Sequence, residues 1–450
     1  MPDVDVLVAG AGAAGLSAAI AAAQRGASVV IAEAHETFRS DSNTAMSTSM
    51  VPAGGSRWQA AAGIEDSPEQ FLSDIQAKTK GRVHETVARA LVGVAPELVA
   101  WLADDVGVPL ELVTDFNYPG HSAYRCHTVP DRAGQTLHRY LLTAAENRGA
   151  TVMVPLRLVG LRFDSHGDIE GATLENPDRV REEISASRVV LATNGFGANP
   201  EMVERHIPEI SGALYFGGHG SNGDAIRLAE RYDLDVSAMG AYQGHGSVAT
   251  PHGVLVTWAT VMHGAVILDN AARRFADETI GYSEFARLVL DREAGEAWLV
   301  LDHAIHEACL RFADYERLVA SNAIRWADDE KELASIIGAP ESSVSETLTS
   351  ARQCAVEGRP DQWGRTLWEA PIEPPYGAVR ITGALFHTQG GLDIDANAAV
   401  LRNREPVPGL YASGGAAVGM SGDGADGYLA GNGLLAALGL GYLAGKAGAG

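Results

Sequence analysis

The chain is poor in cysteine, and the cysteines it has are far apart. Its 450 residues include 3 cysteines, Cys126, Cys309 and Cys354, with no Cys-X-X-Cys pair among them. A disulfide framework or a structural zinc site needs more cysteines at closer spacings, so we expect neither, and no metal site of another kind is indicated. So little cysteine is typical of a reducing compartment, and we expect a cytoplasmic protein.

Positive charge is also scarce. Lysine and arginine together number 34 against 57 aspartates and glutamates, which gives a formal net charge of −23 at pH 7. No basic tail offsets this excess. Nucleic acids and anionic membrane surfaces bind basic proteins, so we expect neither as a partner and look instead for a small-molecule substrate.

Long apolar runs are few. Residues 6–23 follow Asp3 and Asp5 rather than lysine or arginine, which argues against a signal peptide. Residues 433–444 are apolar but short for a membrane span, and they follow a Gly-Asn-Gly turn. We therefore expect no membrane span, a buried helix at 433–444 and a frayed tail at 445–450.

Glycine, in contrast, is abundant, with 51 residues, and the first glycines form a pattern. Residues 5–33 predict a strand, a tight turn, a small-residue helix and a second strand. Gly10 permits the turn, Gly12 lets the backbone approach a pyrophosphate, and Gly15 lets the helix pack closely on the strand. Glu33 ends the second strand, where an acid accepts hydrogen bonds from ribose hydroxyls and disfavours a 2′-phosphate, so we expect FAD or NAD rather than NADP.

Two further strands that end in glycine turns are predicted later in the chain, and a segment of different composition lies between them. Strands that end in glycine turns are predicted at 189–197 and 409–415, and an antiparallel meander at 158–189. Residues 236–374 carry more aromatic and charged residues, which indicates an inserted second domain. The predicted fold is α/β, with two domains in a chain of this length.

Taken in chain order, five motifs resemble those of the fumarate reductase and succinate dehydrogenase flavoprotein superfamily, and most closely its soluble members, which include the 3-ketosteroid dehydrogenases. The motifs are the glycine fingerprint with Glu33, Ala192-Thr-Asn-Gly-Phe-Gly197, Arg274-Phe-Ala-Asp-Glu278, His387-Thr-Gln-Gly-Gly391 and Gly409-Leu-Tyr-Ala-Ser-Gly414. They extend over nearly the whole chain.

This resemblance implies a discontinuous, Rossmann-like FAD-binding domain at 1–235 and 375–450 and a substrate-capping α+β domain at 236–374. The loop that carries a covalent histidine linkage in some members corresponds to residues 42–55, which contain no histidine, so we expect non-covalent FAD. The implied cofactor-binding residues are Gly10, Gly12, Ala14, Gly15, Glu33, Ala34, Ser42, Asn43, Thr44, Ala192, Thr193, Asn194, Gly195, Asp224, His387, Gly414, Asn432, Leu434 and Leu435.

The catalytic residues that the resemblance implies are His245, His387, Tyr282 and Tyr428. Fumarate-reducing members carry two histidines, matched by His245 and His387, and two arginines, whose positions fall at Tyr282 and Tyr428. A phenol cannot replace a guanidinium that clamps a carboxylate, so fumarate and succinate are disfavoured. Tyrosines at comparable places in the ketosteroid dehydrogenases suggest Tyr282 as acid or base and Tyr428 as a group that polarises a ketone, although both could simply line the pocket.

The predicted function is an FAD-dependent oxidoreductase that acts on a CH–CH or C=C bond next to a carbonyl, as a desaturase or an ene-reductase. Two alternatives on the same fold stay open: a redox-neutral isomerase or hydratase, and an oxidase of C–N or C–OH bonds. No second nicotinamide fingerprint is evident, so another protein, a quinone or oxygen would exchange the electrons. Arg125 and His127 lie in a loop that could approach the pocket.

Overall fold

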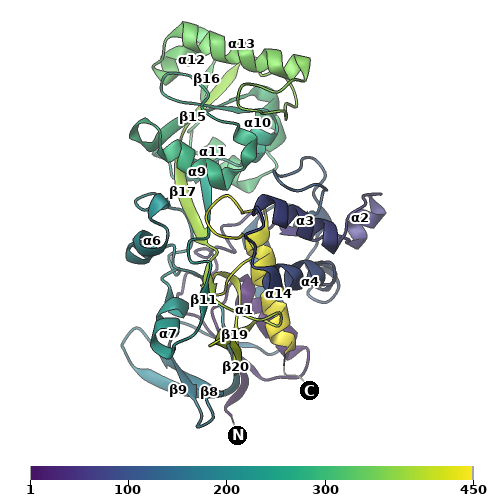
Figure 1. The fold of residues 1–450 in the computed structure, drawn as a ribbon, viewed down its shortest axis with the longest axis vertical. Helices are drawn as coiled ribbons and strands as arrows, with labels where there is room; N and C mark the ends of the chain where they lie inside the picture. The colour runs from purple at the N-terminus through teal and green to yellow at the C-terminus, as the bar shows by residue number, and fades with distance from the viewer. Residues whose placement is uncertain (1, 448–450) are drawn as a thin grey trace.

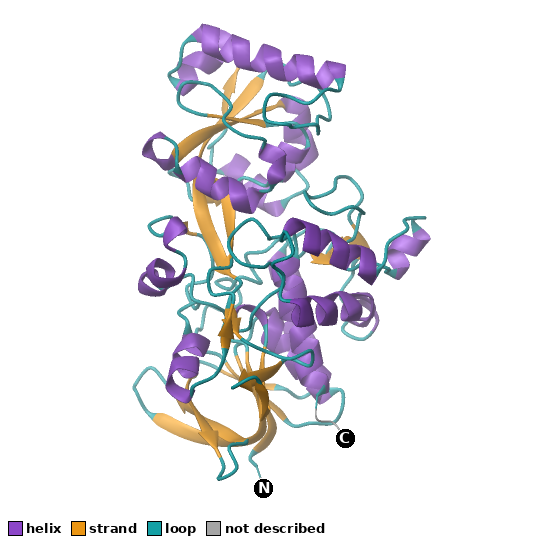
Figure 2. Cartoon of the chain, in the orientation of Figure 1, coloured by secondary structure: helices purple, strands orange, loops and turns teal. Residues whose placement is uncertain are grey.

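The computed structural model describes residues 2–447. The molecule is elongated, with one β-sheet near the chain termini and a second further along the long axis (Figure 1). The loops, drawn teal in Figure 2, gather at mid-height between the two sheets. The α/β class is confirmed.

The first sheet is mainly parallel and carries the glycine fingerprint. Its strand order is β19-β20-β9-β1-β2-β6, with β7 and β8 continuing from β9 as an antiparallel meander. Val6 to Val8 of the first strand are almost completely buried, as expected for a central parallel strand covered on both faces. The strands are β1 (Val4–Ala9), β2 (Val29–Ala32), β6 (Thr151–Met153), β7 (Arg157–Phe163), β8 (Ile169–Glu175), β9 (Arg181–Leu191), β19 (Ala399–Arg402) and β20 (Glu405–Ala412).

Two helices from opposite ends of the chain pack together beside this sheet. They are α1 (Ala13–Ala23) and α14 (Asn432–Lys446). A Cβ atom on Gly441 would lie 2.3 Å from the Ala14 carbonyl oxygen, and one on Gly445 would lie 2.4 Å from that of Ala18, so glycine permits this close approach. The buried helix predicted at 433–444 is confirmed. The frayed tail is wrong for residues 445 and 446, which are helical, and residues 448–450 lie outside the described part.

The second sheet is mainly antiparallel, with the order β13-β12-β17-β15-β14 and with β10 and β16 paired to β17. Long β17 leads from this sheet back towards the first one (Figure 1). The strands are β10 (Leu214–Tyr215), β12 (Tyr242–Ala249), β13 (Val254–Leu255), β14 (Val266–Leu268), β15 (Glu296–Asp302), β16 (Arg325–Ala327) and β17 (Tyr376–Thr388). The hydrogen bonding thus places β17 with the sheet of residues 242–327, beyond the predicted domain boundary at residue 375.

Helices and short strands complete the fold. The helices are α2 (Arg57–Ala61), α3 (Pro68–Lys78), α4 (Glu85–Asp104), α5 (Gly134–Asn147), α6 (Pro200–His206), α7 (Asp224–Tyr232), α8 (Ala259–Met262), α9 (Tyr282–Leu290), α10 (His303–Cys309), α11 (Ala313–Ala320), α12 (Glu330–Ile337) and α13 (Glu341–Glu357). The short strands are β3 (Val51–Pro52), β4 (Glu111–Leu112), β5 (Cys126–Thr128), β11 (Val236–Ser237) and β18 (Gly391–Leu392).

One helix in residues 2–447, α4, is long and apolar enough to cross a bilayer by length and composition. It packs against α3 and α14, and more than half of its most apolar stretch is buried. A core helix of a folded protein has these same properties.

Candidate active site

One large cavity lies between the two sheets and is lined by residues of both. It encloses about 1890 Å³, part of it open to solvent, and its walls come from both chain ends and from the segment between them. One end, the glycine-rich end, is formed by the loops after β1, β2 and β9.

The backbone of the fingerprint explains its glycines. Gly10 has φ +111°, and a Cβ there would lie 2.3 Å from the Ala192 carbonyl oxygen. A Cβ on Gly15 would lie 1.9 Å from the Gly10 oxygen, so Gly15 allows α1 to pack on the turn and does not itself line the cavity. The Glu33 carboxylate accepts hydrogen bonds from the backbone N–H groups of Ala11 and His35, each at 2.8 Å.

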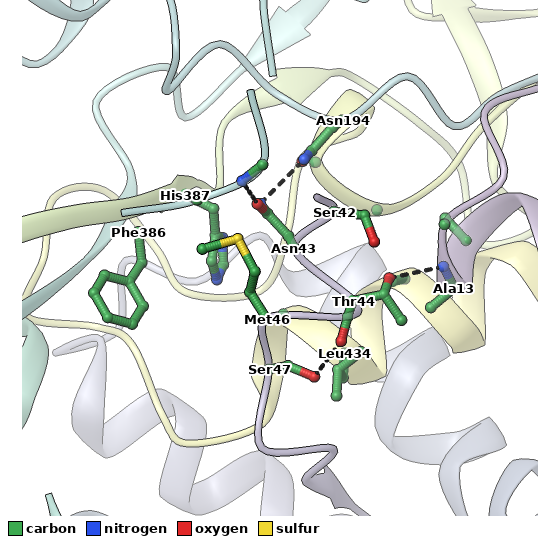
Figure 3. Close-up of a pocket in the computed structure, with 18 of the residues that line it drawn as sticks. Ala13, Ser42, Asn43, Thr44, Met46, Ser47, Asn194, Phe386, His387 and Leu434 are labelled. Atoms are coloured by element: carbon green, nitrogen blue, oxygen red, sulfur yellow. Dashed lines mark hydrogen bonds between the residues drawn. The ribbon is translucent and has the colours of Figure 1, made fainter. Parts of the chain in front are cut away.

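The loop after β2 closes over this end and is fixed by its own polar side chains (Figure 3). The Ala13 N–H donates to the Thr44 hydroxyl at 2.9 Å, which ties the loop to the start of α1. The Asn43 side chain accepts from the Gly218 N–H at 2.7 Å and lies 3.5 Å from the Asn194 amide. Three loops distant in sequence therefore meet around one cavity.

These residues fit FAD. The Thr193 hydroxyl lines the cavity, is buried and has no hydrogen-bond partner among the described residues. Buried polar groups normally have such a partner, so a bound ligand would supply it. The start of α1 directs the positive end of a helix dipole at this space, which suits a pyrophosphate. Of the predicted cofactor residues, the cavity is lined by Gly10, Gly12, Ala14, Glu33, Ala34, Ser42, Asn43, Thr44, Ala192, Thr193, Asn194, Asp224, His387, Gly414 and Leu434, whereas Gly15, Gly195, Asn432 and Leu435 lie behind it.

The other end of the cavity, which we call the aromatic end, contains all four predicted catalytic residues. It is lined by Tyr118, Gln243, His245, Leu255, Thr257, Trp258, Tyr282, Phe386, His387 and Tyr428. Tyr282 stacks on His245 with ring centroids 4.9 Å apart, and the Tyr282 and Tyr428 centroids are 5.9 Å apart. Tyr428 lies edge-on to His387 at 5.6 Å.

Close packing of α9 on β12 creates this arrangement. Tyr282 opens α9, and His245 lies in β12 between two glycines. A Cβ on Gly244 would lie 2.7 Å from the Ala286 Cβ, and one on Gly246 would lie 3.1 Å from Phe285. Because those positions are glycine, the helix approaches the strand and stacks Tyr282 on His245.

Burial controls the charge of these groups. It lowers the pKa of His245 to about 3 and that of His387 to about 4, so both imidazoles are neutral near pH 7. It raises the pKa of Tyr282 and of Tyr428 above the usual range of a phenol, so both hydroxyls are protonated. Among the described lining residues, the one lysine or arginine is Arg157, in the glycine-rich end, where its Nε donates to Asp224 at 2.8 Å.

Sequence reasoning missed three large members of the aromatic end, Tyr118, Trp258 and Phe386. Phe386 precedes the predicted His387, but Tyr118 and Trp258 stand outside every motif and carry no local signal. The expectation for Arg125 and His127 is wrong. Arg125 is fully buried in ion pairs with Asp66 and Asp74, and His127 lies 2.8 Å from the Ser56 hydroxyl, so neither lines the cavity.

The profile of the FAD binding domain family matches residues 5–434. NADH:fumarate oxidoreductase of Klebsiella pneumoniae (strain 342) is 29% identical over 417 residues, which cover 91% of this chain but 44% of that protein. Fumarate reductase (cytochrome) of Shewanella frigidimarina is 26% identical over 447 residues, covering 98% of this chain and 76% of that protein.

Among solved structures, the fold matches the 3-ketosteroid-Δ4-(5α)-dehydrogenase of Rhodococcus jostii RHA1 in complex with 4-androstene-3,17-dione. The TM-score is 0.78 at 26% identity, and the match covers 99% of this chain and 97% of that one. The family resemblance carried by the five sequence motifs is thereby confirmed. The chain belongs to the FAD binding domain family, and it is an FAD-dependent oxidoreductase.

Proposed function

We propose that this protein transfers hydride to or from a carbon–carbon bond next to the carbonyl of an uncharged substrate, such as a ketone or a ring intermediate. The observation that carries the proposal is the composition of the aromatic end. Its phenols are protonated, its imidazoles are neutral, and it contains no arginine or lysine among the described residues.

Tyr428 is the proposed carbonyl-binding group. Its hydroxyl lies 3.3 Å from the backbone nitrogen of Gly433, which donates to it in the first turn of α14. A phenol beside a helix N-terminus places donors and the positive end of a dipole together, and such a pair polarises a carbonyl oxygen. Polarisation acidifies the C–H next to a ketone in one direction and activates the conjugated alkene in the other.

Tyr282 is the proposed proton-transfer group. A bound flavin would supply the hydride for the carbon β to the carbonyl when reduced and would accept it from that carbon when oxidised. The Tyr282 phenol then gives its proton to the α carbon during alkene reduction, or takes one from it during desaturation. Its raised pKa means that the phenol carries this proton near pH 7. Adjacent His245 stacks on the ring and covers one of its faces.

The relatives support the reaction type, and the lining argues against their dicarboxylates. Fumarate reductases are named for a substrate with two carboxylates, and buried carboxylates require charged partners. The structural neighbour that holds 4-androstene-3,17-dione binds a diketone without charge. An uncharged carbonyl compound therefore fits the aromatic end better than fumarate does.

The division of labour in the chain follows from this proposal. Residues 1–235 and 375–450 bind FAD, and residues 236–374 cap the substrate, with β17 shared because it pairs in the second sheet. FAD is held without a covalent bond, since residues 42–55 contain no histidine. Acid precipitation tests the last point: the yellow flavin should remain in the supernatant, and a yellow pellet would contradict non-covalent binding.

Substrate charge is the direct test of the proposed function. We would titrate the oxidised enzyme with 2-cyclohexenone and with its carboxylated analogue, following the visible flavin band. We expect a saturable spectral shift with the uncharged compound and at least tenfold weaker binding of the carboxylate. Equal or tighter binding of the carboxylate would overturn the claim that the substrate is uncharged.

A further inference from the structure

Three tyrosines at the aromatic end come from three separate segments of the chain, and the end of one helix contacts all three segments. Tyr118 precedes β5, Tyr282 opens α9, and Tyr428 precedes α14. Helix α3 lies outside the cavity, yet its last turn and the residues after it touch each of these segments. It belongs to the part of the chain that lies before α4, more than 200 residues from Tyr282.

Lys78, the last residue of α3, holds the turn that carries Tyr282. Its ammonium donates to the Ile280 carbonyl oxygen at 2.7 Å and forms an ion pair with the Glu284 carboxylate. The side chains of Lys78 and Glu284 are 11% and 15% exposed, so this pair is shielded from water and bulk salt. Burial raises the pKa of Glu284, and Lys78 opposes that shift.

The turn between these two contacts is conformationally demanding. Gly281 has φ +138°, which an L-residue rarely adopts, and it is the residue immediately before Tyr282. A Cβ there would lie 2.5 Å from the Glu284 Oε2 atom and 3.1 Å from the Lys78 Nζ atom. On the opposite side, the Gly244 N–H donates to the Ser283 hydroxyl at 3.0 Å. The backbone at Tyr282 is therefore held from both sides, and Lys78 is the contact from outside the second sheet.

The same stretch of chain also braces the other two loops. Asp74 of α3 accepts from the Ser122 N–H at 2.8 Å, which fixes the loop after Tyr118. Buried Thr79 packs against Gly427, where an added Cβ would lie 3.0 Å from the Thr79 methyl group. The end of α3 therefore helps to set the positions of the three phenols relative to one another.

We propose that Lys78 is a positioning residue for Tyr282, and this proposal rests on the function proposed above for Tyr282. Without the ammonium, the Glu284 carboxylate is left buried with no counter-charge, and the Gly281 turn loses its outer anchor. The phenol then moves relative to the carbonyl site at Tyr428. A misplacement of about 1 Å costs an enzyme on the order of a hundredfold in rate, while binding of the substrate changes little.

The test compares Lys78→Met with Lys78→Arg, Glu284→Gln and the matched control Lys80→Met. Lys80 is 70% exposed on its side chain and pairs with Asp426 at the surface, so its removal should change little. Flavin reoxidation by an enone under single-turnover conditions separates the rate constant from the substrate dissociation constant. For Lys78→Met we expect a rate constant lower by about tenfold to a hundredfold, with less than threefold change in dissociation constant and full FAD content. Lys78→Arg should recover most of the rate.

A second readout does not need turnover. With 3-fluorotyrosine at position 282, the ¹⁹F resonance should be single and sharp in the parent protein and in Lys80→Met, and shifted or broadened in Lys78→Met and Glu284→Gln. Unchanged resonance and unchanged rate in Lys78→Met would overturn the positioning role. If Lys78→Met does not fold, Lys78→Arg and Glu284→Gln decide in its place. A parent enzyme that responds to no enone would refute the proposed function, and the ¹⁹F spectra would still decide whether Lys78 positions Tyr282.

Discussion

The two ends of the cavity are built in different ways. The glycine-rich end consists of short motifs in which neighbours in sequence are neighbours in space, as in Gly10 and Gly12 or Ser42 to Thr44. The aromatic end is assembled from segments far apart in the sequence, which contribute residues such as Tyr118, Trp258 and Tyr428, separated by more than a hundred residues each. The residues that bind the cofactor therefore lie in short sequence motifs. The residues proposed for the chemistry are brought together by tertiary packing.

This difference explains why related proteins can share one flavin fold and differ in substrate. The glycine-rich end constrains the backbone, where added Cβ atoms would collide with carbonyl oxygens. At the aromatic end, side chains on β12, α9 and β17 are presented by a rigid scaffold. Exchange of an arginine for a tyrosine there would remove a positive charge from the pocket without changing the glycine-rich end.

The largest effect is expected from a substitution that removes the proposed proton donor but leaves the FAD-binding residues unchanged. Tyr282→Phe should lower the rate of enone reduction by about 10²–10⁴-fold, because a phenyl ring has no proton to transfer. FAD content and thermal midpoint should stay close to those of the parent protein, as the glycine-rich end is untouched. Steady-state rates and the ratio of bound flavin to protein check both parts. Near-normal turnover would remove Tyr282 from the mechanism.

A substitution at the glycine-rich end should affect FAD binding and leave the chemistry at the aromatic end unchanged. Glu33→Gln removes the carboxylate that is expected to accept hydrogen bonds from the ribose hydroxyls of FAD, and hydrogen bonds to charged groups contribute about 1.5–3 kcal/mol. FAD affinity should therefore fall by roughly tenfold to a hundredfold. Turnover per bound flavin should be unchanged, as measured by fluorescence titration of the apoprotein followed by assays at saturating FAD. A loss of turnover per flavin would show that the two ends are coupled.

A smaller effect is expected from the histidines of the aromatic end. Burial lowers the pKa of His245 to about 3 and that of His387 to about 4, against about 6.5 in an unfolded chain. Between pH 6.5 and 4 the unfolded chain therefore binds more protons, so the free energy of unfolding decreases as the pH falls. Each histidine contributes up to about 1.4 kcal/mol per pH unit in that window.

Urea unfolding at a series of pH values measures this slope. The variant His245→Asn removes one of the two titrating groups, so its stability should fall less steeply below pH 6.5. An identical slope in the parent protein and the variant would mean that His245 is not held neutral in the folded state.

Sequence reasoning succeeded where function depends on backbone shape. It indicated the fingerprint from glycine spacing, because few structures besides a nucleotide-binding turn require glycines at this fixed spacing. The loop at Ser42 to Thr44, the turn after Leu191 and the start of α14 were assigned to the cofactor through the family resemblance. It also brought His245, Tyr282, His387 and Tyr428 to one cavity through the family resemblance. A family is recognised from its motifs, so the resemblance did not identify cavity residues that lie outside those motifs.

The features that were not predicted depend on contacts between residues far apart in the sequence. Such contacts produce no recognisable pattern in the local sequence. Tyr118 reaches the cavity because Asp74 holds the loop that follows it, and the whole of α4 separates Asp74 from that loop in the sequence. Arg125 was expected near the pocket, but its charge is satisfied by Asp66 and Asp74 behind the wall. Likewise, β17 follows the predicted boundary at residue 375, and its pairing with β12 of the second sheet as far as Thr388 has no signal in the local composition.

Anaerobic titration of the flavin is the most direct test of the central claim that FAD and an uncharged carbonyl substrate meet beside Tyr282. The purified enzyme would be photoreduced and mixed with cyclic enones or with fumarate, and the oxidised enzyme would be mixed with the saturated ketones. We predict that enones restore the visible flavin band and that fumarate does not. Restoration by fumarate alone, or no response to any enone or ketone, would contradict this claim.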